Sequence, residues 1–225
     1  MAAAAAALFV TAGSAAASDY PEQVKLTVGR VKYGGGGDWY SDPSSLPNLL
    51  AEFRRRTGIE TAPAEKVVTL TSPELYRYPF LYITGHGNIE LTSEELDKLR
   101  NHLLGGGFLY ADDNYGMDKS FRRMVRKLFP ERNLMQVPFS HPIYHSVYDL
   151  KGPPKIHEHD GNPPMGLGIF EGDRIILFYT FESDIGDGLE DASVHGDPPQ
   201  LREQALRMAV NILYYALTRQ SYTGD

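Results

Sequence analysis

Three segments of the sequence place carboxylates or imidazoles where they can do chemistry. Asp112 and Asp113 are adjacent, and two neighbouring carboxylates repel each other, so one of them keeps its proton more readily than the other. Such a pair can work as acid and base or bind a cation. His86 lies between Gly85 and Gly87, where an imidazole can ligate a metal or transfer a proton. These three side chains are candidate catalytic residues.

Both features also have a structural explanation that the sequence leaves open. An aspartate pair at the start of a helix caps that helix and supplies its acidic first turn. His86 can equally cap the helix that follows it. The sequence alone does not separate capping from chemistry.

Two further groups of histidines have the composition of a metal site. His141 and His145 are four residues apart, so a helix would bring both imidazoles to one face, although Pro142 and Ile143 favour a turn as much as a helix. We take this pair as candidate ligands of a divalent metal. Residues 157–160, His-Glu-His-Asp, also resemble a metal site, but they are more typical of a solvated loop.

The elements that position these residues alternate along the chain. Strands are predicted at 26–33, 66–70, 80–84, 108–111, 135–137 and 174–180, and helices at 46–56, 92–104, 121–129 and 201–217. A capping box, Thr92 to Glu95, marks one helix start. This alternation predicts an α/β fold with a mostly parallel sheet in a three-layer α/β/α sandwich.

Polar segments follow five of the predicted strands, at 34–40, 85–88, 112–116, 140–145 and 182–188. Ligands bind beyond the carboxyl ends of parallel strands, so we expect these segments to form a cleft. The expected ligand-binding residues are Gly85, Gly87, Asn88, Asn114, Tyr115, Asp38, Trp39 and Asp184, and Glu182 is a further candidate catalytic carboxylate.

Composition excludes several classes of function. The 22 Lys and Arg residues against 29 Asp and Glu residues give a net charge of −7, which disfavours binding to nucleic acid. The absence of cysteine rules out disulfides, zinc–thiolate sites and thiol nucleophiles. Residues 34–37 are four glycines, but they lack the Lys and Ser or Thr of a phosphate-binding P-loop.

The segments 85–88, 106–116 and 141–148, together with the capped helix and the terminal helix, resemble the bacterial domain-of-unknown-function family numbered 4159 over roughly residues 22–218. The resemblance implies an exported or membrane-linked protein with a flavodoxin-like fold, similar to class I glutamine amidotransferases. In those enzymes a turn after a central strand carries a cysteine nucleophile. Here the corresponding turn is 112–114, and the chain has no cysteine, so the glutaminase reaction is excluded.

Three functions are compatible with these residues. A binding domain would hold a small polar ligand, such as a saccharide stacked on Trp39, Tyr40 or Tyr115. A carboxylate- or metal-assisted hydrolase would use two carboxyls roughly 5–10 Å apart, with Asp113 and Glu182 as the pair to measure. A structural subunit of the cell envelope would pack an aromatic surface on protein partners, because the chain has 14 tyrosines. The binding domain is the favoured interpretation.

Residues 1–18 are uncharged and mostly small, and no basic residue precedes the short apolar run. The small residues at 15–17 fit a secretory cleavage site, whereas the alternative is an Ala-rich disordered tail. We expect a signal peptide at 1–18 and a single α/β domain at 19–225, in the periplasm or outside the cell. No later stretch is apolar enough to span a membrane, so we expect no span in the mature chain.

We predict that the mature protein begins near Ser18 or Asp19, because the small residues before this point fit signal-peptidase cleavage. Intact-mass spectrometry of protein isolated from the native cell envelope should show that this leader is missing. A mass corresponding to all 225 residues in that fraction would contradict export through the leader.

Overall fold

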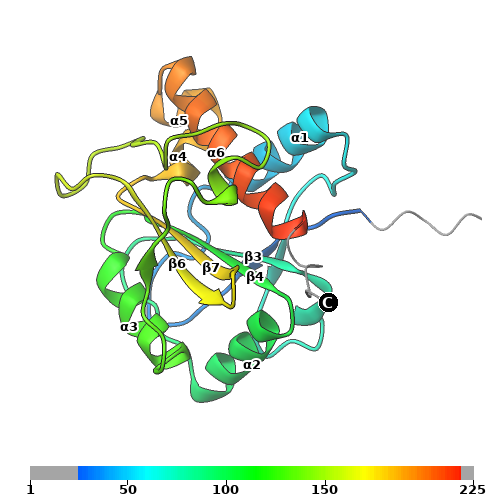
Figure 1. The fold of residues 1–225 in the computed structure, drawn as a ribbon, viewed down its shortest axis with the longest axis vertical. Helices are drawn as coiled ribbons and strands as arrows, with labels where there is room; N and C mark the ends of the chain where they lie inside the picture. Colours follow the sequence, from blue (N-terminus) through cyan, green and yellow to red (C-terminus); the bar gives the residue numbers. More distant parts are fainter. Residues whose placement is uncertain (1–24, 219–225) are drawn as a thin grey trace, which may run out of the picture.

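The computed structural model describes residues 25–218, and the expected leader at 1–18 lies outside them. Seven strands form one sheet in the order β2-β1-β3-β4-β7-β6-β5. Strands β3, β4, β6 and β7 of this sheet lie at the centre of the molecule in Figure 1. The strands are β1 (Gly29–Val31), β2 (Lys66–Val68), β3 (Phe80–Ile83), β4 (Phe108–Asp112), β5 (Met135–Gln136), β6 (Met165–Glu171) and β7 (Arg174–Phe181).

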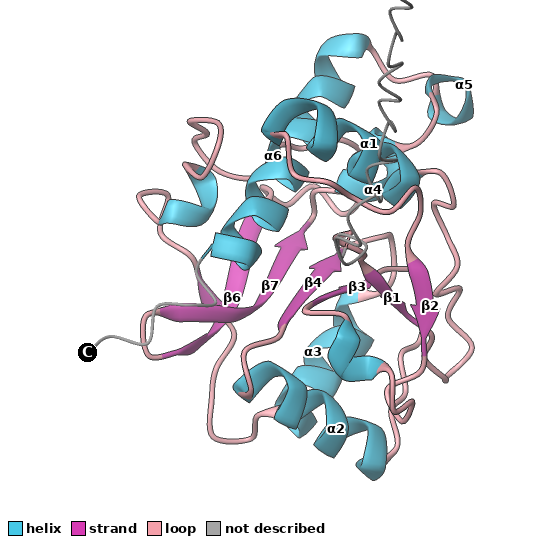
Figure 2. Ribbon diagram, turned by 90° about the vertical axis from the view of Figure 1, so that its right-hand side faces the viewer, coloured by secondary structure: helices cyan, strands magenta, loops and turns pink. Residues whose placement is uncertain are grey.

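Helices connect most of these strands. They are α1 (Ser45–Thr57), α2 (Ser93–Leu104), α3 (Asp118–Leu128), α4 (Ile185–Leu189), α5 (Ala192–His195) and α6 (Pro199–Thr218), with short 3-10 helices η1 (Leu75–Arg77) and η2 (Pro142–Tyr144). In Figure 2, α1, α4 and α6 lie on one side of the sheet and α2 and α3 on the other. None of the helices within residues 25–218 has the length and apolar character needed to cross a membrane.

The predicted α/β fold with a mostly parallel sheet is confirmed. Strands β2, β1, β3, β4 and β7 pair in parallel, whereas β6 is antiparallel to both β7 and β5. The antiparallel part arises because only two residues, Gly172 and Asp173, connect β6 to β7. Gly172 has φ +58°, a left-handed conformation that favours glycine and suits a tight hairpin turn.

The central strands are buried on both faces, as their apolar sequences predict. Phe80 and Tyr82 of β3 belong to the hydrophobic core beside α1 and α6, and Leu81 and Ile83 belong to the core beside α2 and α3. Successive side chains of a strand point to opposite faces, so the side chains of β3 contribute alternately to the two cores. The polar groups that follow such a strand are therefore held at a fixed edge of the sheet.

Strand β6 and, at this edge, helices α4 and α5 escaped prediction. The segment 185–195 forms α4 and α5, although its glycines and acidic residues show no helical pattern of apolar side chains. A side chain at Gly188 would place its Cβ 2.6 Å from the Ala205 Cβ, so the glycine allows α4 to pack closely on α6. This tertiary contact fixes the segment where the local sequence does not.

Candidate functional site

The carboxyl edge of the sheet is organised around Asp112, the last residue of β4, which has no exposed surface. Its Oδ1 accepts hydrogen bonds from the hydroxyls of Tyr110 (3.0 Å) and Thr180 (2.6 Å) and from the Ile185 N–H (3.2 Å). Its Oδ2 accepts one from the Gly186 N–H. One carboxylate therefore ties together β4, β7 and α4.

This environment makes Asp112 a positioning group. Burial, and next the charge of Asp184, raise the pKa of Asp112 to about 7, although hydrogen bonds from Thr180 and Gly186 oppose the shift. Both oxygens already have donors within the fold. Asp112 therefore holds the start of α4 in place, and its catalytic role stays a prediction.

Asp113 faces a different set of groups. Its Oδ2 accepts the Glu182 N–H at 2.8 Å and lies 4.0 Å from Nδ1 of His159. Only 2% of the residue is exposed, and burial raises the pKa of its carboxyl to about 6. Helix α3 begins at Asp118 with Met117 at its N-cap, so the aspartate pair does not cap this helix. The capping explanation is wrong for this pair.

Glu182 clamps the loop that precedes β6. Its Oε2 accepts from Lys155 Nζ at 2.7 Å, and its Oε1 accepts from Asn162 Nδ2 at 3.1 Å and the Asp160 N–H at 3.2 Å. Burial opposes ionisation, but these contacts, led by Lys155, lower the pKa of Glu182. The pKa values of Asp113 and Glu182 therefore move in opposite directions.

Asp42, which the sequence did not single out, enters the site from the loop after β1. The buried guanidinium of Arg30 donates to its carbonyl at 3.2 Å, and Asn114 Nδ2 donates to its Oδ2 at 3.2 Å. Burial, followed by the charges of Asp187 and Asp184, raises the pKa of Asp42 to about 8. Asp42 thus contributes another carboxyl to an already acidic region.

Three histidines alternate with the carboxylates of Asp184 and Asp187. His159 Nε2 and His157 Nδ1 each lie 3.2 Å from Asp184 Oδ2, His157 Nδ1 lies 2.9 Å from Asp187 Oδ2, and His195 Nε2 lies 3.5 Å from Asp187 Oδ1. The bond to Asp184 is the main cause that raises the pKa of His157, to about 10, and also raises the pKa of His159. Despite burial, the two histidines lower the pKa of Asp184.

The expectation that residues 157–160 form a solvated loop is wrong for His159, whose side chain is only 6% exposed. The sequence did show that residues 157–160 combine imidazoles and carboxylates. Their partners Asp184 and Asp187 lie more than twenty residues further along the chain. Only the fold brings the two groups together.

Backbone strain and unpaired polar atoms both concentrate here. Among the described residues, Asp42, Glu182 and Asp184 are the non-glycine residues with positive φ, at +54°, +55° and +60°. Such conformations gather at functional sites. The buried Oδ1 atoms of Asn114 and Asp184 also lack hydrogen-bond partners. An unpaired buried acceptor is costly, and these two oxygens have the capacity to accept further hydrogen bonds.

The remaining predicted ligand-binding residues form a rim on the loops after β1 and β3. His86 Nδ1 lies 3.0 Å from Asp38 Oδ2, and the His86 side chain is 55% exposed. Asn88 Nδ2 donates to the Gly35 carbonyl at 3.2 Å. Gly85 and Gly87 have φ of +131° and +86°, which this turn requires and glycine tolerates. Capping by His86 is excluded, because Thr92 caps α2.

Aromatic rings border the same edge. Tyr40 and Tyr115 are 63% and 58% exposed, whereas Trp39 is half-buried and packs beneath Lys32. The Tyr115 ring meets the ring of His159 edge-on, with centroids 5.6 Å apart. The rim therefore combines apolar ring surface with buried acceptors.

The predicted pair of metal-binding histidines lies at η2, after β5. His145 contacts Asp149 through Nδ1 and the Phe139 carbonyl through Nε2, and His141 Nδ1 accepts the Ile143 N–H at 3.2 Å. Both ring nitrogens of His145 and Nδ1 of His141 thus have partners other than a metal. The metal pair stays a prediction.

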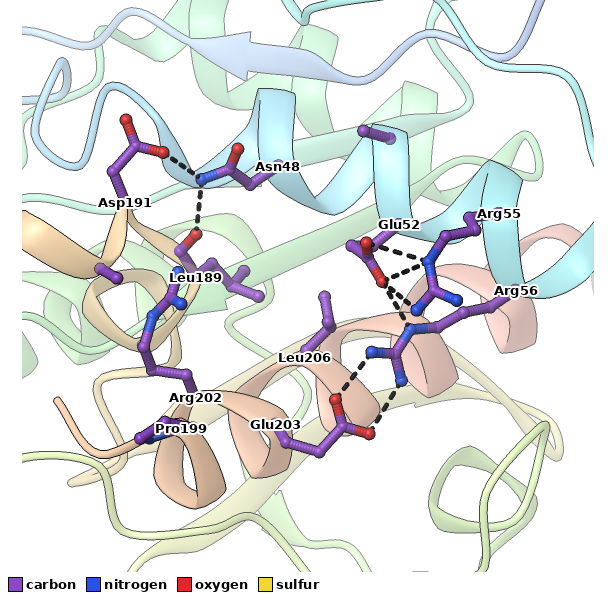
Figure 3. A pocket seen from close by; sticks show the side chains of 13 residues that line it. Asn48, Glu52, Arg55, Arg56, Leu189, Asp191, Pro199, Arg202, Glu203 and Leu206 are labelled. Atoms are coloured by element: carbon purple, nitrogen blue, oxygen red, sulfur yellow. Dashed lines mark hydrogen bonds and ion pairs between the residues drawn. The ribbon is translucent and has the colours of Figure 1, made fainter.

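A groove of about 570 Å³ lies between α1 and α6 (Figure 3). Charged side chains in this groove pair with one another. Arg56 contacts Glu52 at 2.9 Å and Glu203 at 2.7 Å. Asn48 bonds the Leu189 carbonyl at 3.0 Å and so links α1 to α4. None of the predicted site residues lines this groove.

A family model described as "Domain of unknown function (DUF4159)" matches residues 27–217. The match spans most of the chain, so the chain belongs to this family. A search of the curated proteins found no match.

We predict that Gly186→Ala destabilises the protein by roughly 1–3 kcal/mol, because a Cβ there would lie 2.5 Å from Asp42 Oδ2 and 3.1 Å from Asp112 Oδ2. Urea unfolding measures the effect. Gly34→Ala is the control, since its Cβ would meet only the Glu90 carbonyl, at 3.4 Å. Equal stability of the two variants would contradict this account of the packing.

A second prediction concerns pH. The folded pKa of Asp113, about 6, exceeds the unfolded value of about 3.9, so the folded state binds the proton more tightly. This contribution to stability is complete below the unfolded pKa and is lost as pH rises to 6. Relative to Asp113→Asn, the wild type should lose roughly 2–3 kcal/mol of unfolding free energy over this range. Parallel pH profiles of the two proteins would contradict the shift.

Proposed function

We propose that this member of the DUF4159 family is an exported binding protein that holds a hydroxyl-rich ligand, a saccharide, at the carboxyl edge of its sheet. The proposal rests on one observation above all. The exposed rings of Tyr40 and Tyr115 lie beside a cluster of buried polar acceptors, one of which, Asn114 Oδ1, has no hydrogen-bond partner. Export rests on the leader sequence.

The two rings start from neighbouring points of the fold. Ser41, which follows Tyr40, accepts a hydrogen bond from Asn114 Nδ2 at 3.3 Å, and Asn114 immediately precedes Tyr115. Ligand sites combine aromatic surface with a few placed polar groups. A sugar offers an apolar ring face to tyrosine and hydroxyl donors to carboxylate and amide oxygens. The rim offers both kinds of partner.

The strand order supports the same location. Numbered along the chain, the five parallel strands have the spatial order 2-1-3-4-5, which is that of flavodoxin-like folds. We therefore also propose the flavodoxin-like three-layer arrangement for this domain. In such folds the ligand binds where the strand order reverses, between β1 and β3. Asp38 and His86 meet at this point.

A carboxylate-assisted hydrolase is the second candidate, because the environments of Asp113 and Glu182 push their pKa values apart. Pairs of this kind supply the acid and the base of hydrolytic sites. Glu182 is engaged with Lys155 at 2.7 Å, which favours binding over hydrolysis as the first choice.

Saccharide binding can be tested with a glycan array, followed by calorimetry with the oligosaccharides that bind. Tyr115→Ala should weaken binding roughly 10-fold, because it removes the stacking surface. Tyr76→Ala is the matched control, since Tyr76 is equally exposed (57%) but lies on η1, before β3 rather than after it.

Failure of the full-length protein to bind any glycan, or equal affinity of the two variants, would contradict saccharide binding. Release of reducing sugar from a bound oligosaccharide, abolished in Asp113→Asn, would instead select the hydrolase.

A further inference from the structure

We propose that His157, Asp187 and His195 form a binding site for a divalent transition-metal ion. The three residues come from separate segments: the loop before β6, helix α4 and helix α5. The inference stands apart from the proposed saccharide site, because none of these side chains belongs to the aromatic rim. It also uses a different set of ligands from the predicted metal pair, His141 and His145, at η2.

The ligand atoms already have the spacing that a metal needs. His157 Nδ1 lies 2.9 Å from Asp187 Oδ2, and His195 Nε2 lies 3.5 Å from Asp187 Oδ1. One ligand atom from each residue lies within 4.8 Å of the other two. A tetrahedral ion with bonds of about 2.0–2.1 Å separates its ligands by about 3.3–3.4 Å, so small side-chain movements suffice.

The second ring nitrogen of His157 makes the kind of hydrogen bond that a metal-ligating histidine makes. Its Nδ1 faces Asp187, while its Nε2 lies 3.1 Å from Asp197 Oδ1. In metal sites a carboxylate commonly holds the second ring nitrogen, which fixes the tautomer and orientation of the imidazole. Asp197 is placed to do this.

Two buried carboxylate oxygens beside His157 are an independent observation in favour of a bound cation. Asp184 is 5% exposed and the Asp197 side chain is 10% exposed. Each directs one oxygen at His157, and the other oxygen, Asp184 Oδ1 or Asp197 Oδ2, is buried without a hydrogen-bond partner. An unpaired anionic oxygen in a buried place is costly, and a nearby divalent charge offsets that cost.

The surrounding charge favours a cation as well. Among residues 25–218, the ion-pair partners of Asp184, Asp187 and Asp197 are histidines, with no Lys or Arg. Two imidazole nitrogens with one carboxylate suit Zn²⁺, Mn²⁺, Fe²⁺ or Ni²⁺, whereas Mg²⁺ and Ca²⁺ prefer oxygen alone. The His195 side chain is 29% exposed, which gives an ion access from solvent.

The test is a calorimetric titration of the full-length, chelator-treated protein with ZnCl₂. The wild type should bind one equivalent, and His195→Ala should reduce the affinity at least about 100-fold. Asp197→Asn, which alters the group behind His157, should reduce it about 10–100-fold. Titration with Co²⁺ provides a second readout, because its visible absorption becomes much stronger on four-coordinate binding, and His195→Ala should abolish this increase.

His145→Ala is the matched control, since His145 is similarly exposed (36%) and also contacts a carboxylate, Asp149. It should bind Zn²⁺ as the wild type does. Absence of binding by the wild type, unchanged affinity in His195→Ala, or an equal loss in His145→Ala would each overturn the proposal. Circular dichroism verifies folding of each variant. His195→Ala carries the decision if Asp197→Asn does not fold, because the His195 side chain is partly exposed at the end of α5.

Discussion

The buried carboxylate of Asp112 is the interaction on which the geometry of the carboxyl edge depends. It accepts hydrogen bonds from Tyr110 on its own strand, from Thr180 on β7 and from the backbone at the start of α4. A fully buried carboxylate is tolerated only with such a complete set of donors. The position of α4, and with it that of Asp187, depends on these hydrogen bonds together with the close packing of Gly188 on α6.

Several carboxylates are buried close together at the same edge, and ionising all of them is unfavourable because of burial and mutual repulsion. The fold spreads this charge by raising the pKa of Asp42 and Asp113, by pairing Glu182 with Lys155, and by placing histidines between aspartates. Left-handed backbone conformations occur at three of the carboxylate residues. Structures retain strain of this kind where the surrounding packing enforces it, and functional sites are where it gathers.

The site therefore has an outer and an inner part with different chemistry. The outer rim, around Tyr40, His86 and Tyr115, is exposed and combines aromatic rings with the paired side chains of His86 and Asp38. The inner part, around His157 and Asp187, is mostly buried and strongly charged. Asn114 connects the two, because it donates to Asp42 of the inner part and directly precedes Tyr115.

The sequence by itself determined the alternation of strands and helices, the double-sided burial of β3, and the meeting of several polar loops at one edge. Those features depend on local periodicity, capping and the direction of parallel strands. Only the tertiary structure decided that Asp112 is a structural anchor, that His157 and His159 face Asp184, and that 185–195 is helical. These outcomes depend on contacts between residues far apart in the chain, and no local pattern encodes which buried carboxylate meets which imidazole.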